Sequence, residues 1–184
     1  MITNLYLVRH AHSTYTPEEL TRPLSDQGFR DVDKVTALLE DKSIEHVLSS
    51  PYLRAFQTVE GIATLLDTEI KLVEDLKERT LSRTAVDDFP YAIEKVWTNP
   101  NFSWEGGESN LSAQQRGIKA IQKIIKDYHG KNVAIGTHGN IMVLIMNYFD
   151  KQYGFAFWKQ LEMPAIYQLS FDGEHYMHTT RILD

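Results

Sequence analysis

The chain has 184 residues, of which 42% are hydrophobic and 24% charged, a composition typical of a globular protein with one sizeable core. Its formal net charge of −6 opposes nonspecific binding to nucleic acid or to an anionic membrane. The absence of cysteine excludes disulfides, zinc–thiolate sites and cysteine nucleophiles.

The first predicted strand, at 4–8, ends directly in an arginine and a histidine. Four consecutive apolar residues, Leu5-Tyr6-Leu7-Val8, favour a strand covered on both faces, as in a parallel sheet. Ligands of such sheets bind beyond the carboxyl ends of the strands, where Arg9 and His10 lie. Arginine is a permanently charged fork for oxyanions, and its charge favours the neutral, nucleophilic form of a neighbouring histidine. The pair therefore indicates phosphate chemistry.

Further strands are predicted at 45–49, 69–73 and 132–136, alternating with helices. The expected buried stripe of the helix at 26–41 consists of Phe29, Val32, Thr36 and Leu39. That of the helix at 112–128 consists of Ile118, Ile121, Ile125 and Tyr128. The dipeptide Asp172-Gly173 predicts a hairpin between 165–171 and 175–181. Together these elements predict a three-layer α/β/α sandwich with a mostly parallel, mixed sheet and helices on both faces.

The stretch 76–108 is less regular than the rest, with two prolines, two adjacent glycines and one predicted helix at 85–98. Such a long excursion is more often a lid or a pocket wall than a second domain. We therefore expect a single domain over residues 1–184.

A second arginine follows the second predicted strand. Ser50 as N-cap and Pro51 at the first helical position would place Arg54 about one turn into a helix. Free backbone N–H groups at a helix start favour an anion, and Arg54 would add a charged fork. A capped helix with Arg54 facing water is the alternative interpretation.

A second histidine follows the last of these strands. His138 ends the apolar run, Gly139 permits close backbone approach, and a helix is predicted at 140–149. Two histidines and two arginines at the carboxyl ends of three strands favour a functional site.

The chain resembles the histidine phosphatase superfamily, also called phosphoglycerate mutase-like, in three motifs: Arg9-His10, Ser49-Ser50-Pro51-x-x-Arg54, and Thr137-His138-Gly139-Asn140. The resemblance implies the fold of that family, His10 as the phosphoryl-accepting nucleophile, and a phosphate pocket of Arg9, Arg54 and His138. It implies no metal and no other cofactor. We expect the arginines to lower the pKa of His10 and His138 to act protonated, so that the two imidazoles titrate apart.

The leaving group of a phosphomonoester needs a proton, which calls for a carboxylic acid near the site. The resemblance places that acid shortly after the third strand and before an arginine, where Glu78 precedes Arg79. Asp75, Glu105 and Glu108 are the rival candidates.

The resemblance also assigns substrate contacts to Ser13, Gly139, Glu108 and Ser109. A helix N-cap at Ser109 or Asn110 is an equally good interpretation of the last segment. Ala11 and His12 stand where the family usually has glycine and glutamate, so the substrate contacts of this loop are expected to differ.

A metal site is the alternative for the histidines, because His10 and His12, two residues apart, could share an ion with His138. Against it, no motif places a further carboxylate ligand, and two flanking arginines would repel a cation.

These observations predict a metal-independent phosphomonoesterase that hydrolyses a small phosphorylated metabolite through phosphohistidine at His10. Phosphoglycerate mutase is the first alternative. The resemblance implies an adjacent arginine pair for a mutase, which the chain lacks, although Arg79 and Arg83 could partly substitute. A non-catalytic phosphoester-binding protein is the second. We expect a cytoplasmic monomer or homodimer with no nucleic-acid or membrane partner, since neither a secretion signal nor a bilayer-spanning run is apparent.

Overall fold

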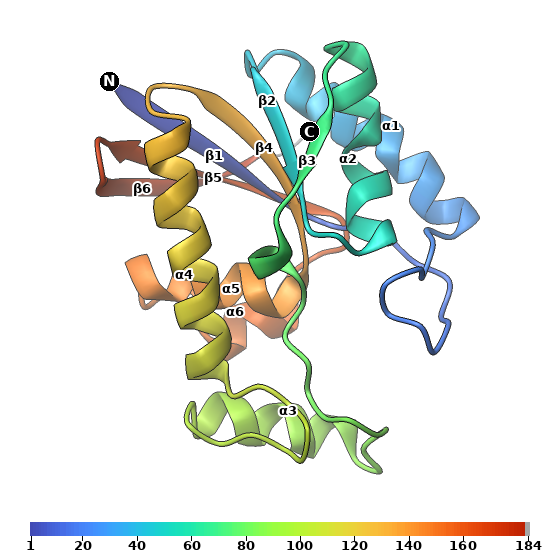
Figure 1. Cartoon of the computed structure of the whole chain (residues 1–184). Helices are drawn as coiled ribbons and strands as arrows, with labels where there is room; N and C mark the ends of the chain where they lie inside the picture. Colours follow the sequence, from blue (N-terminus) through green and yellow to red (C-terminus); the bar gives the residue numbers. More distant parts are fainter. Residues whose placement is uncertain (183–184) are drawn as a thin grey trace.

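A six-stranded mixed sheet with the strand order β3-β2-β4-β1-β5-β6 forms the centre of the protein, as seen in a computed structural model that describes residues 1–182 (Figure 1). The strands are β1 (Ile2–Arg9), β2 (His46–Ser49), β3 (Ile70–Leu72), β4 (Asn132–Thr137), β5 (Ala165–Asp172) and β6 (His175–Ile182). Neighbouring strands from β3 to β1 pair in parallel, whereas β5 is antiparallel to both β1 and β6. The predicted mixed sheet and its terminal hairpin are confirmed.

Helices cover both faces of the sheet. They are α1 (Asp26–Glu40), α2 (Leu53–Leu65), α3 (Phe89–Thr98), α4 (Asn110–Asp127), α5 (Gly139–Phe149) and α6 (Phe155–Gln160), with a short 3-10 turn η1 (Glu74–Leu76). One core cluster joins Leu5 and Leu7 of β1 to α4 and α5, and the other joins Tyr6 and Val8 to α1 and α2. Figure 1 shows these two helix pairs on opposite sides of the strands. The α/β sandwich with three layers is thus confirmed.

The sheet register brings three strand ends to one edge. Arg9 of β1 pairs with Thr137 of β4, and Ser49 of β2 pairs with Gly136 beside it. The residues that follow these strands therefore leave the sheet at the same place. No helix in the described part of the chain is long and apolar enough to cross a membrane.

The predicted stripe of α1 is wrong in its orientation. The buried residues are Gly28, Asp31, Val35 and Leu39, and only Leu39 was expected. Phe29 is 47% exposed. The cause is the loop before the helix: a Cβ at Gly28 would lie 2.1 Å from the carbonyl oxygen of His12, so this loop packs against the first turn and only glycine fits there.

Val32 and Thr36, also expected on that stripe, are half-buried against α2, where a Cβ at Gly61 would lie 2.1 Å from Thr36 Oγ1. In α4 the prediction is confirmed, because Ile118, Ile121 and Ile125 are buried. Tyr128 packs partly buried against the same core cluster.

The excursion at 76–108 contains a shorter helix than predicted. Helix α3 begins at Phe89 rather than at 85, because the Asp88 side chain accepts a hydrogen bond from Tyr91 N and caps the helix. The preceding residues, 79–86, are irregular and line a cavity beside the strand ends.

Candidate active site

His10 lies just beyond β1 and is held by its backbone and by its ring. Its N–H donates to Thr137 O of β4 at 3.0 Å, and the residue is only 8% exposed. Ring atom Nδ1 lies 2.7 Å from Ala11 O. Because a carbonyl oxygen only accepts, Nδ1 carries the proton and Nε2 is unprotonated, with a lone pair that accepts a hydrogen bond from Arg54. The ring thus presents a nucleophilic nitrogen toward the site.

The imidazole of His10 is neutral at ordinary pH. Its pKa is lowered to about 3, mainly by burial and in addition by the charges of Arg54, Arg9 and Arg22, against the opposing hydrogen bond to Ala11. The predicted direction is therefore right, but the leading cause is desolvation rather than the neighbouring arginines.

Arg54 lies in the first turn of α2 and is 3% exposed. Its Nε approaches His10 Nε2 at 3.3 Å. The predicted helix start at Ser50 and Pro51 is wrong, since α2 begins at Leu53 after Tyr52. Ser50 Oγ instead accepts from Tyr52 N and lies 2.8 Å from His138 Nε2. Ser50 therefore positions His138 instead of capping the helix.

His138 is fully buried at the start of α5, with its ring centroid 5.2 Å from that of His10. Burial first, and then the charges of His10 and Arg54, lower its pKa well below the usual value. The expectation of a protonated His138 is thus wrong for this structure, in which burial favours the neutral ring. Its Nδ1 is buried and has no hydrogen-bond partner within residues 1–182.

Arg9 and Gly139 are in direct contact. Arg9 Nη1 donates to Leu161 O and to Glu162 O, the latter at 3.1 Å, which pins the guanidinium beneath α5. A Cβ at Gly139 would lie 3.1 Å from Arg9 Nε and 3.2 Å from Cζ. Glycine is therefore required here to make room for the arginine.

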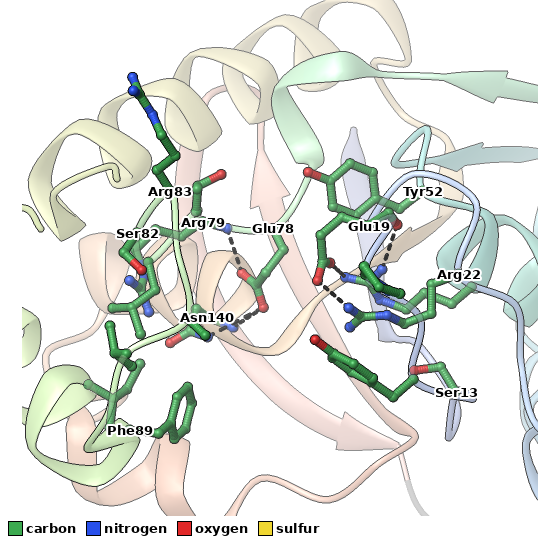
Figure 2. Close-up of a pocket in the computed structure, with 18 of the residues that line it drawn as sticks. Ser13, Glu19, Arg22, Tyr52, Glu78, Arg79, Ser82, Arg83, Phe89 and Asn140 are labelled. Atoms are coloured by element: carbon green, nitrogen blue, oxygen red, sulfur yellow. Dashed lines mark hydrogen bonds and ion pairs between the residues drawn. The ribbon is translucent and has the colours of Figure 1, made fainter. Parts of the chain in front are cut away.

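Glu78 lies at the N-terminus of α5 (Figure 2). Its Oε1 accepts from Arg79 N at 2.8 Å and Ile141 N at 3.0 Å, and its Oε2 accepts from Asn140 N at 3.0 Å. Of the four predicted acid candidates, only Glu78 lines the cavity.

Glu108 and Ser109 have structural contacts instead. Both carboxylate oxygens of Glu108 bind Arg116 at 2.8 Å. Arg116 in turn donates to Asp75 O and Lys77 O, so this pair supports the segment that carries Glu78. Ser109 Oγ accepts from Ser112 N and caps α4.

The cavity beside His10 has a volume of about 630 Å³. Of the predicted site residues, His10, Ser13, Arg54 and Glu78 line it, whereas Arg9, His138, Gly139, Glu108 and Ser109 do not. His12 is hydrogen-bonded to the N-cap of α1 through Ser25 Oγ at 2.8 Å. Within the described residues, no group of three or more possible metal ligands is assembled.

Two charged pocket residues were not predicted, Glu19 and Arg22. Both come from the loop between β1 and α1, and Figure 2 shows them on the wall opposite Glu78. Glu19 Oε2 lies 2.8 Å from Arg54 Nη2, and its other oxygen accepts from Arg22 Nη2. The only sequence signal is an ordinary charged loop, Pro17 to Pro23, which is typical of solvent-exposed turns.

Arg79 also lines the cavity and is 4% exposed. Its Nε and Nη1 are buried and have no hydrogen-bond partner in the described chain. Burial lowers the pKa of this guanidinium, and the negative charges of Glu78 and Glu108 oppose the effect. A bound anion would stabilise this buried guanidinium, because two of its nitrogen atoms have no hydrogen-bond partner.

Comparison with known proteins identifies relatives in sequence and in fold. A putative phosphoserine phosphatase 2 of Hydrogenobacter thermophilus is 25% identical over 154 residues, which cover 77% of this chain and 76% of that protein. A metal-independent phosphoserine phosphatase of Arabidopsis thaliana is 27% identical over 159 residues, covering 77% and 66% of the two chains. The solved structure of an Entamoeba histolytica phosphoserine phosphatase in complex with 3-phosphoglyceric acid superimposes with a TM-score of 0.81 at 18% identity, over 99% of this chain and 98% of the other.

The chain also matches a model built for a whole protein family. The model of the histidine phosphatase superfamily (branch 1) matches residues 5–180, from the first strand to the last. The chain belongs to the histidine phosphatase superfamily.

Proposed function

We propose that the protein is a metal-independent phosphomonoesterase that acts on a small phosphorylated metabolite through phosphohistidine at His10. The observation that carries this proposal is the unprotonated Nε2 of His10, whose lone pair accepts a hydrogen bond from the buried guanidinium of Arg54 at 3.3 Å. The names of the relatives add support, since two of them are phosphoserine phosphatases.

In the first step, Nε2 of His10 attacks phosphorus while the ester P–O bond breaks. The leaving oxygen takes a proton from the Glu78 carboxyl, and Arg9 and Arg54 stabilise the charge on the transferring group. In the second step, water attacks the phosphohistidine, Glu78 accepts a proton from it, and the N–P bond breaks to release inorganic phosphate.

Substrate binding supplies the protonated His138 that this mechanism needs, because the negative charge of the phosphate favours the charged form of the imidazole. His138 Nδ1, which lacks a partner, is the ring atom available to donate to a phosphoryl oxygen. Ser50 holds the other ring nitrogen.

Phosphoglycerate mutase is the second candidate, because Arg79 and Arg83 line the same cavity and could retain a second acidic group. Two assays separate the phosphatase, the mutase and a binding protein. The phosphatase releases p-nitrophenol from p-nitrophenyl phosphate at an equal rate with and without a chelator. A mutase interconverts 3- and 2-phosphoglycerate, and a binding protein does neither. Loss of hydrolysis in chelator, restored by a divalent ion, would contradict the proposal.

A further inference from the structure

The phosphate-binding face of Arg54 is occupied by a part of the protein itself. Arg54 Nη2 lies 2.8 Å from Glu19 Oε2, and Nη1 donates to Glu19 O at 2.9 Å. With Nε directed at His10, every nitrogen of the guanidinium has a protein contact. Figure 2 shows the Glu19 carboxylate beside Arg22, whose Nη2 donates to its other oxygen. A carboxylate therefore lies where the proposed mechanism requires a phosphoryl oxygen.

The two partners differ in their freedom to move. Arg54 is 3% exposed at its side chain, whereas the side chain of Glu19 is 48% exposed. The backbone of the loop is held separately, because Leu53 N donates to Leu20 O at 2.9 Å. Arg22 Nε and Nη2 also bind Thr16 O within the loop. The Glu19 carboxylate can thus leave Arg54 by side-chain rotation alone.

We propose that Glu19 is an internal competitor of the substrate phosphate for Arg54 and sets the affinity of the site. This inference rests on the proposed function, since it requires the phosphoryl group to bind Arg54. When phosphate binds, the contact between Glu19 Oε2 and Arg54 Nη2 breaks, while the contact between Glu19 Oε1 and Arg22 Nη2 is kept. The apparent affinity for phosphate is lowered by the fraction of molecules in which Glu19 holds the arginine.

The test replaces Glu19 by glutamine, which keeps the side-chain size and the backbone contact to Nη1 and removes the negative charge. Glu18→Gln is the matched control, because it removes the same charge one residue earlier from an exposed side chain that does not line the cavity. The probe is inorganic phosphate, titrated by calorimetry. The KM of p-nitrophenyl phosphate is measured in parallel.

We expect Glu19→Gln to lower the Kd of inorganic phosphate and the KM by about two- to fivefold, the range of a partly exposed ion pair. Glu18→Gln is expected to change neither. Unchanged or weaker phosphate binding in Glu19→Gln, or an equal gain in Glu18→Gln, would overturn the inference. Tighter phosphate binding in Glu19→Gln without hydrolysis by the wild type would support the inference and refute the phosphatase proposal.

Discussion

Gly139→Ala is predicted to lower the activity of the protein without lowering its stability. The new Cβ would lie 3.1 Å from Arg9 Nε, 3.2 Å from Cζ and 3.3 Å from Nη2. Ordinary contacts of this kind are near 3.6 Å or longer, so the guanidinium must move by about 0.5 Å. It cannot move freely, because Nη1 is bound to the carbonyl groups of Leu161 and Glu162.

A misplacement of about 1 Å at a catalytic group costs about 100-fold in rate, so a shift of half that size predicts about a tenfold loss of kcat. The free energy of unfolding is expected to stay equal or to rise by up to about 1 kcal/mol, because alanine is more favourable than glycine at a helical position. The assay compares kcat for p-nitrophenyl phosphate with the urea midpoint of unfolding.

Gly154→Ala is the control for that experiment. Gly154 also lies at a helix start, but the nearest atom to its new Cβ, Lys151 O, is 4.0 Å away. This variant is expected to keep full activity. Full activity in Gly139→Ala, with the variant folded, would refute the argument that Arg9 needs the space beside α5.

Two further predictions follow from the buried histidines. The folded pKa of His10, lowered to about 3 against about 6.5 in the unfolded chain, means that the unfolded state binds more protons between these values. Stability is therefore full above pH 6.5 and falls as pH drops toward 3; at pH 4.5 the loss from His10 is about 3 kcal/mol. His10→Gln should flatten this dependence in urea unfolding at pH 7 and pH 4.5, and an equally steep dependence would contradict the assignment. Ser50→Ala should lower kcat about tenfold with little change in KM, because it frees the His138 ring; a change in KM alone would argue against this positioning role.

The residues at the strand ends could be predicted for two reasons: the end of a strand is visible in the local sequence, and the order of the elements along the chain places the strand ends at one edge of the sheet. Apolar runs mark where β1 and β4 end, and parallel strands place their carboxyl ends together. The pairing of Arg9 with Thr137 then brings His10 and His138 into contact, although they are 128 positions apart in the chain.

Glu19 could not be predicted in this way. Its partner, Arg54, is 35 residues distant, and the contact depends on how an irregular loop folds over the start of α2. Charged residues in a loop follow no periodic pattern that would indicate where their side chains point. The sequence therefore does not distinguish an acidic side chain that points into a pocket from one that points into water.

The contacts of Glu108 and Ser109 and the orientation of α1 could not be predicted for a related reason, although the N-cap at Ser109 was one of the two interpretations of its segment. Short motifs are compatible with both structural and functional roles, and the distant Arg116 decides the role of Glu108. The rotation of α1 is set by Gly28 against His12 O rather than by its apolar pattern. The pKa of His138 likewise depends on complete burial, which no local pattern specifies. The cytoplasmic location, the single-domain organisation and the monomeric or dimeric state stay predictions.

The most direct test of the mechanism is the stereochemical course at phosphorus. The substrate is a phosphorothioate monoester made chiral by oxygen isotopes, and the configuration of the released thiophosphate is determined. Two successive displacements, onto His10 Nε2 and then onto water, predict retention of configuration. Inversion would mean that water attacks the substrate directly, and His10 would then not be the nucleophile.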